Sequence, residues 1–201
     1  MLQRYRNFPT FASRILSNCE MLQFLKNIFQ VIISPDRGWE DIGAEGKKAE
    51  IELMPKFLLL GAVASVTVFM SLLFGVRDVT FVQTAVGAVV VFLKFLIGYF
   101  LAVYVFINFM ADYFTGGPNE NKIRTICIYS IAILMIFQIL SNLIPHSLPI
   151  MSCLPFYLIV VVWKAMRYLL VDDSRTIPFV VISSLVLTLP PILLGLFANM
   201  I

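Results

Sequence analysis

Residues 57–76 read FLLLGAVASVTVFMSLLFGV and contain no charged side chain. A helix needs roughly 20 apolar residues to cross the hydrocarbon core of a bilayer, so this stretch is long enough to span a membrane. The charged pair Arg77-Asp78 follows it directly and ends the apolar run. The stretch therefore predicts a membrane-spanning helix.

Four further stretches of the chain are also long and apolar enough to span a membrane. They cover about residues 81–111, 125–144, 150–170 and 177–198 and are continuously apolar. Continuous apolarity favours helices, because the strands of a membrane barrel alternate in hydrophobicity with a period of two. We therefore predict an all-α, polytopic membrane protein in which residues 57–201 form a bundle of five transmembrane helices.

The composition of the whole chain supports a membrane protein. Of its 201 residues, 60% are hydrophobic and only 13% are charged, and the mean hydropathy is +0.91. A soluble globular domain has about 25% charged residues, so this chain has too little polar surface to coat a water-soluble core. We expect contact with the lipid bilayer and no binding of nucleic acid.

The positions of the basic residues predict how the bundle is oriented. Eight of the 15 Lys and Arg residues precede residue 57, two lie in the 112–124 loop, and three lie at or after the end of the fourth span. With five crossings these regions share one side, and Arg77 is the only basic residue on the other. By the positive-inside rule, the amino terminus is cytoplasmic and the carboxyl terminus is outside.

Residues 1–56 form a charged, cytoplasmic amino-terminal segment that contains one helical pattern at about residues 22–33. This run is too short to span a bilayer. It fits an amphipathic helix at the membrane interface, and it equally fits a helix that packs its apolar stripe against the bundle. Ser34-Pro35 ends the run, because proline cannot continue the hydrogen-bond ladder. The apolar residues at helical spacing are Leu22, Leu25, Ile28, Phe29, Ile32 and Ile33, opposite Gln23, Lys26, Asn27 and Gln30.

Lys94 is the charged residue that stands deepest inside a predicted span. A lysine at mid-membrane costs roughly 2.5–3.5 kcal/mol on insertion scales, which suggests a cation site, an anion path or a proton relay. However, no Asp or Glu lies inside any predicted span. The alternative is that Lys94 extends its ammonium group toward the outer surface or bonds to a backbone carbonyl.

Other candidates for chemistry are few. Pro190-Pro191 lies inside the last span and should kink or break that helix. The single histidine, His146, cannot build a zinc site alone, because such a site needs three or four ligands. The three cysteines, Cys19, Cys127 and Cys153, are far apart and show no CxxC spacing, so we expect reduced cysteines that serve packing. We predict no catalytic residue, no metal site and no cofactor.

The loop between the second and third spans carries Gly116-Gly117. It lacks the GxxxxGK[ST] pattern of a phosphate-binding loop and follows no predicted strand. We therefore interpret the two glycines as a turn whose residues adopt positive φ angles.

Two motifs make the chain resemble the Yip family of Ypt/Rab-interacting membrane proteins and their bacterial relatives over about residues 21–201. The first motif has the pattern P-x-x-x-W-x-x-I and directly follows the predicted amphipathic helix. The second motif is a Gly-Gly pair in the loop after the second span, followed by basic residues and by a tyrosine near the start of the third span. The apolar-proline pair that usually follows the tyrosine is missing, and residues 1–20 are additional. The residues that carry the resemblance are Pro35, Trp39, Ile42, Gly116, Gly117 and Tyr129.

The resemblance implies a non-enzymatic protein with five spans. Eukaryotic members are associated with vesicle trafficking, Rab GTPases and membrane curvature, whereas the bacterial relatives mostly have no defined activity. The long acidic or proline-rich cytoplasmic domain of many eukaryotic members is absent here, which favours a protein of the bacterial plasma membrane.

We therefore predict a membrane scaffold or interaction protein that contacts a membrane or cytoplasmic protein partner. The candidate contact surface is the helix carrying Leu22, Leu25 and Phe29, together with the cytoplasmic loops. The alternative hypothesis is a small transporter or channel subunit, alone or as a homo-oligomer. That alternative depends on Lys94 and on Pro190-Pro191, which resembles the discontinuous helices of transporters.

Overall fold

The chain is helical throughout the part described by the computed structural model. The described part contains no strand beyond one isolated bridge between Phe114 and Val171. The prediction of an all-α fold is therefore confirmed. The described residues are 11–70, 80–144, 150–172 and 175–198, without the side chains of residues 11–19, 150–155 and 195–198.

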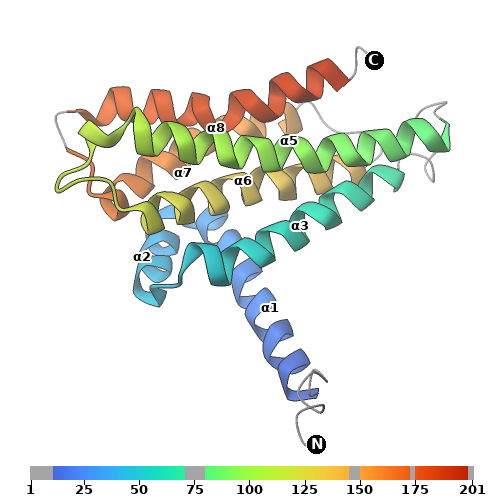
Figure 1. The fold of residues 1–201 in the computed structure, drawn as a ribbon, viewed down its shortest axis with the longest axis horizontal. Coiled ribbons are helices and arrows are strands. Elements are labelled where there is room, and N and C mark those ends of the chain that lie inside the picture. The colour runs from blue at the N-terminus through green and yellow to red at the C-terminus, as the bar shows by residue number, and fades with distance from the viewer. Residues whose placement is uncertain (1–10, 71–79, 145–149, 173–174, 199–201) are drawn as a thin grey trace, which may run out of the picture.

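Five long helices form the bundle in Figure 1. They are α3 (Met54–Val66), α5 (Phe81–Asn108), α6 (Glu120–Leu143), α7 (Ile150–Leu169) and α8 (Thr176–Ala198). Helix α5 lies along α8, and α6 packs against α3, α5 and α7. All side chains of α6 between Ile123 and Ile136 are buried except Arg124 and Leu134, so α6 is the central helix of the core.

Four helical segments of the described chain are long and apolar enough to cross a membrane. They are Ala49–Phe69, Phe81–Asn108, Glu120–Leu143 and Thr176–Leu194. These segments agree with the predicted first, second, third and fifth spans. Helix α7 coincides with the predicted fourth span but is not among the four, so a fifth crossing stays a prediction.

Local capping explains where two of these helices begin. Helix α5 starts after Thr80, whose hydroxyl accepts from the Gln83 backbone N–H while the Gln83 side chain accepts from the Thr80 N–H. Helix α6 starts after Asn119, whose side chain accepts from the Lys122 N–H at 3.2 Å. Such caps satisfy donors that have no partner within the helix. The α6 cap lies before residue 125, so helix α6 begins ahead of the predicted start of the third span.

The amino-terminal segment folds into two helices and one short turn. Helix α1 (Phe11–Ile33) runs obliquely away from the bundle in Figure 1, and α2 (Pro35–Glu45) folds back against it. A π-helical turn, η1 (Ala49–Leu53), then leads into α3. Where α1 and α2 cross, a Cβ on Gly38 would lie 2.7 Å from Val31 Cγ2 and 2.8 Å from its Cα. The two helices can approach this closely because residue 38 is glycine.

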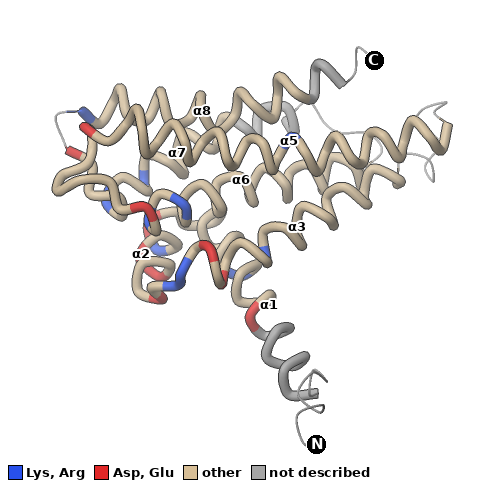
Figure 2. The backbone as a smooth tube through the Cα atoms, viewed as in Figure 1, with Lys and Arg blue, Asp and Glu red and all other residues tan. Residues whose placement is uncertain are grey.

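Charged residues gather at the end of the bundle where α2 lies, as Figure 2 shows. At this end the loop between α5 and α6 contacts the loop between α7 and α8, since the Arg175 guanidinium donates a hydrogen bond to the Asp112 carbonyl at 3.2 Å. The amino-terminal segment meets the same region, where Arg124 pairs with Glu50 at 2.8 Å. Among the described residues that follow α1, the three basic regions predicted to share one side therefore lie at one end of the molecule.

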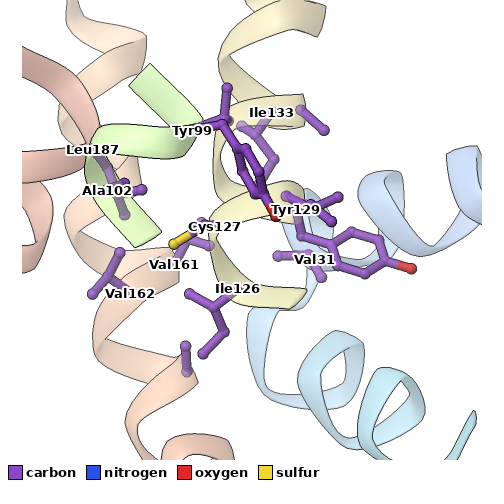
Figure 3. Packing of buried hydrophobic residues seen from close by; sticks show 14 of the residues in the cluster. Val31, Tyr99, Ala102, Ile126, Cys127, Tyr129, Ile133, Val161, Val162 and Leu187 are labelled. Carbon is purple, nitrogen blue, oxygen red and sulfur yellow. The ribbon is translucent and has the colours of Figure 1, made fainter. Parts of the chain in front are cut away.

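The core is continuous from the amino-terminal helices to α8. Figure 3 shows its centre, where side chains of α5, α6, α7 and α8 surround Cys127. The Cys127 thiol is free and fully buried, so the predicted packing role of this cysteine is confirmed. The side chains of Cys19 and Cys153 lie outside the described residues, as does the whole of His146.

Candidate functional site

The indole of Trp39 fixes helix α2 to the bundle. Its ring is 2% exposed, stacks on Tyr168 with centroids 5.9 Å apart, and donates its N–H to the Val161 carbonyl at 3.0 Å. This hydrogen bond satisfies a polar group that would be costly to bury alone. Pro35 begins α2 at its first turn, where the missing backbone N–H is not needed. The Pro35–Trp39 motif therefore starts α2 and anchors it to α7.

Tyr129 reaches the same junction from α6. Its ring lies edge-on to Trp39 at 6.2 Å and 5.3 Å from the ring of Phe24 on α1. Figure 3 shows the Tyr129 ring directed from α6 toward the amino-terminal helices. The structure thus brings together two residues that the sequence motifs singled out separately, Trp39 and Tyr129. We call this contact region of α1, α2, α6 and α7 the aromatic junction.

A polar network closes the aromatic junction on its α1 side. Asn27 is only 2% exposed and donates to the Glu45 carboxylate at 2.9 Å and to the Tyr129 hydroxyl at 3.4 Å. Gln23 donates to the other Glu45 oxygen at 2.8 Å, and Lys47 pairs with Glu45 at 2.8 Å. A half-buried carboxylate with three donors is well compensated, so the network holds α1 against α2.

The surroundings of Glu45 also change its acidity. Burial acts to raise the pKa of Glu45, but the hydrogen bonds from Lys47, Asn27 and Gln23 favour the ionised form more strongly. The pKa of Glu45 therefore lies below its ordinary value. Glu45 stays ionised at neutral pH and keeps accepting from α1.

The structure divides the faces of α1 differently from the sequence prediction. The face buried against the bundle carries Phe24, Asn27, Ile28 and Val31. The side predicted to be polar instead faces α2, because Glu45 and Asp41 offer carboxylates to Gln23, Asn27 and Gln30. Of the two alternatives raised by the sequence, packing against the bundle holds for this face. The assignment of one apolar stripe to α1 was wrong.

Most residues of the predicted contact surface point away from the protein. Leu22 is 69% exposed, Phe29 51% and Ile33 81%, whereas Leu25 is partly buried against the core. Leu22, Lys26, Phe29 and Ile33 fall on one side of the helix at spacings of four, three and four residues. We call these four residues the outer stripe of α1. It is an exposed apolar surface with one cation at its centre.

Gly116 and Gly117 form the predicted turn. Their φ angles are +89° and +91°, in the region where a side chain is strained, so the prediction of positive φ is confirmed. The turn lies at the charged end, beside a backbone hydrogen bond from the Thr115 N–H to the Leu170 carbonyl at 2.9 Å. The role of the two glycines is to shape this loop.

Lys94 has a side-chain partner that the sequence analysis did not propose. Its Nζ donates to Gln138 Oε1 at 2.7 Å and lies 4.9 Å from the centroid of the Phe95 ring. Gln138 donates in turn to Asn142 at 3.0 Å, and Asn142 donates to the Thr67 hydroxyl at 3.0 Å. Lys94 thus heads a polar chain through α5, α6 and the short helix η2 (Thr67–Phe69) that follows α3.

Pro190 and Pro191 do not break the last helix. Helix α8 continues through both residues from Thr176 to Ala198, and its ribbon changes direction along its length in Figure 1. The prolines pack where α5 has a glycine, because a Cβ on Gly98 would lie 3.3 Å from Pro191 Cγ. Of the two predicted outcomes, a kink or a break, the break does not occur. The comparison with discontinuous transporter helices therefore loses its support.

Sequence reasoning missed two sets of polar residues. Asn27 interrupts a buried apolar face formed by Phe24, Ile28 and Val31, and Gln138 and Asn142 are spaced four residues apart within an apolar span. Isolated amides in such positions are a readable signal, because a buried amide needs a partner. Within the described residues, no group of three or more His, Cys, Asp or Glu side chains could hold a metal ion.

Comparison with known protein families gives one match to the chain. A family model described as the Yip1 domain matches residues 29–197, which is most of the chain. The protein belongs to the Yip1 domain family. The matched Yip1 domain includes Trp39, Tyr129 and all of the spanning helices, so the chain is an integral membrane protein with several apolar helices. The searches of curated proteins and of solved structures found no match to the chain.

Proposed function

We propose that this Yip1 domain protein is a non-enzymatic membrane scaffold whose contact surface is the outer stripe of α1 together with the loops at the charged end. The observation that carries the proposal is the way α1 is held. One face is fixed by Phe24, Asn27 and Val31, while Leu22 and Phe29 on the opposite face stay exposed. Exposed apolar side chains on a rigidly held helix are typical of a surface that contacts a partner or the membrane interface.

The proposed surface faces the cytoplasm. The amino-terminal segment before residue 57, the 112–124 loop and the region from Lys164 to Arg175 carry thirteen of the 15 basic residues, and the positive-inside rule assigns such regions to the cytoplasmic side. With five crossings the carboxyl terminus is outside. We propose the bacterial plasma membrane as the location.

Scaffolding accounts for the internal polar groups better than catalysis does. Trp39, Asn27 and Glu45 all bond to other parts of the chain, so their polar atoms serve to connect helices. A catalytic group must keep a polar atom within reach of a substrate. We infer that these residues hold the surface in position and do not act on a bound molecule.

The test is to replace Leu22, Phe29 and Ile33 together with asparagine in the full-length chain. All three are exposed, so folding and membrane insertion should be unchanged, whereas proteins crosslinked to the wild type at a photo-reactive residue placed at Lys26 should be lost. Glu52→Ala, an exposed change outside the stripe, is the matched control and should keep the crosslinks. If the triple variant gives the same crosslinked proteins as the wild type, the outer stripe is not the contact surface.

A further inference from the structure

The charge of Lys94 is not neutralised inside the described part of the chain. Three cations nearer the charged end, Lys56, Arg124 and Lys164, pair with the carboxylates of Glu20, Glu50 and Asp36 at 2.8–3.1 Å. Lys94 instead bonds to the neutral amide of Gln138. An ammonium group has three donors, so a single amide oxygen uses one of them and supplies no negative charge.

The polar chain behind Gln138 stabilises this cation without balancing it. Each amide turns its oxygen toward the lysine and its nitrogen away, from Gln138 through Asn142 to the Thr67 hydroxyl, which donates to the Ala64 carbonyl at 2.7 Å. Aligned hydrogen bonds of this kind polarise one another and favour a charge at the accepting end. The arrangement therefore gives the Lys94 ammonium group an acceptor but no negative charge.

Among the residues that the structure describes, no carboxylate pairs with Lys94. The acidic residues nearest to Lys94 in sequence are Asp78 and Asp112, and none lies inside any of the predicted spans. A second copy of this protein would bring the same spans and therefore no carboxylate to meet Lys94. A counter-charge within the membrane has to come from a different molecule, since buried charges are normally paired.

A groove on α5 begins one helical turn from Lys94, although Lys94 itself does not line it. It has a volume of about 690 Å³, and its walls begin at Ile97 and Leu101, which lie one and two turns beyond Lys94 on the same side of α5. It continues along Tyr104 to Asn108 and is mainly apolar, and its one charged lining residue, Arg124, already pairs with Glu50. Ile97 and Leu101 are 46% and 44% exposed, so this face of α5 is not covered by the described part of the bundle.

We propose that this face of α5 docks a membrane-spanning helix of a different protein, which carries a carboxylate at the depth of Lys94. The apolar groove receives the side chains of that helix, and the ion pair with Lys94 fixes its register. In a medium of low dielectric constant, an opposite charge close to an uncompensated cation is strongly attracted. This site lies within the span and does not depend on the outer stripe of α1 or on the proposed scaffold role.

The test uses the full-length protein in phosphatidylcholine vesicles and a synthetic oligoleucine helix that carries one glutamate at its centre. Association is measured by energy transfer between labels on the protein and on the peptide. The glutamate peptide should bind the wild type on the order of tenfold more tightly than the same peptide with glutamine. Lys94→Met should reduce this ratio to about one, and Lys94→Arg should preserve it.

Two further variants separate the proposal from its alternatives. Ile97→Trp should fill the groove and weaken both peptides, whereas Val86→Trp, at an exposed position of α5 outside the groove, should weaken neither. Lys94→Met/Gln138→Leu removes both partners of the hydrogen bond and serves if Lys94→Met alone does not fold. Equal binding of the two peptides by folded wild type would overturn the proposal. So would loss of the glutamate preference when phosphatidylglycerol is added, since an anionic lipid would then be the counter-charge.

Discussion

At the scale of single residues, a few side chains hold the amino-terminal helices against the bundle, and each of them makes both a ring contact and a hydrogen bond. Trp39 packs its ring on Tyr168 and bonds its N–H to α7. Tyr129 contacts both Trp39 and Phe24, and its hydroxyl accepts from Asn27. Because each of these residues contacts more than one helix, a change at one position affects the docking of both α1 and α2.

Trp39→Phe should lower the stability of the protein in detergent by about 2 kcal/mol, because it removes one buried hydrogen bond and part of an aromatic stack. The only other tryptophan, Trp163, is 57% exposed and provides a matched control. Trp163→Phe should leave the thermal unfolding temperature within about 1 °C of the wild type. Equal effects of the two changes would contradict the anchoring role of Trp39.

Glu45 predicts a dependence of stability on pH. Its folded pKa is depressed, so ionised Glu45 stabilises the fold at pH values above its unfolded pKa of about 4.3, and this contribution is lost as the pH falls through the folded pKa. Glu45→Gln should therefore unfold at a lower temperature than the wild type at pH 7. The difference should shrink as the pH is lowered below about 4.

The control for this pH experiment is Glu40→Gln on the same helix. The side chain of Glu40 is exposed, and its carboxylate has no hydrogen-bond partner among the described residues. Its replacement should leave the unfolding temperature close to that of the wild type at both pH values. A Glu45→Gln difference that stays constant as the pH is lowered from 7 to well below 4 would show that the carboxylate does not titrate as we expect.

At the scale of elements, the apolar spans could be predicted from sequence and the faces of α1 could not. A run such as 57–76 determines its own environment, because no amount of packing can place so many apolar residues in water. The faces of α1 depend on what lies opposite. Asn27 is buried only because α2 brings Glu45 to it, and the two residues are 18 positions apart in the sequence.

The same reasoning applies to the candidate site. The positive φ angles of Gly116 and Gly117 are a local property, so the sequence predicted them correctly. The partner of Lys94 is Gln138, which lies on another helix and is 44 positions away. Likewise, Pro190 and Pro191 pack against Gly98 on α5, a contact between helices that the sequence of α8 alone does not contain.

The crossing of α1 and α2 makes Gly38 sensitive to any side chain. Gly38→Ala should destabilise the docking of α1 by about 1–2 kcal/mol, because steric overlap with Val31 exceeds the gain in helix propensity. Limited proteolysis near Ser34 should become faster. Gly87→Ala, where the new Cβ would be 3.6 Å from Val68 Cγ1, is the control and should leave the rate of cleavage unchanged.

At the scale of the whole molecule, the end of the bundle that carries most of the charged residues is also the end at which the α5–α6 and α7–α8 loops lie. Helices α5 and α6 are joined at the charged end, as are α7 and α8, and the amino-terminal segment enters the bundle there as well. An odd number of crossings is the only count that lets these three regions share one side and also separates the two termini. The orientation therefore depends on α7 crossing the membrane with the other four helices.

This orientation can be tested by labelling single cysteines in a variant without Cys19, Cys127 and Cys153. A cysteine at Asn119 lies in the loop at the charged end, and one at Phe81 lies at the opposite end of α5 and is 69% exposed. In intact cells, a membrane-impermeant maleimide should label the cysteine at position 81 and should label the one at 119 only after the membrane is opened. Labelling of both from outside would mean that residues 81 and 119 share a compartment. Helix α5 would then not cross the bilayer, and the assignment of thirteen basic residues to the cytoplasm would fail with it.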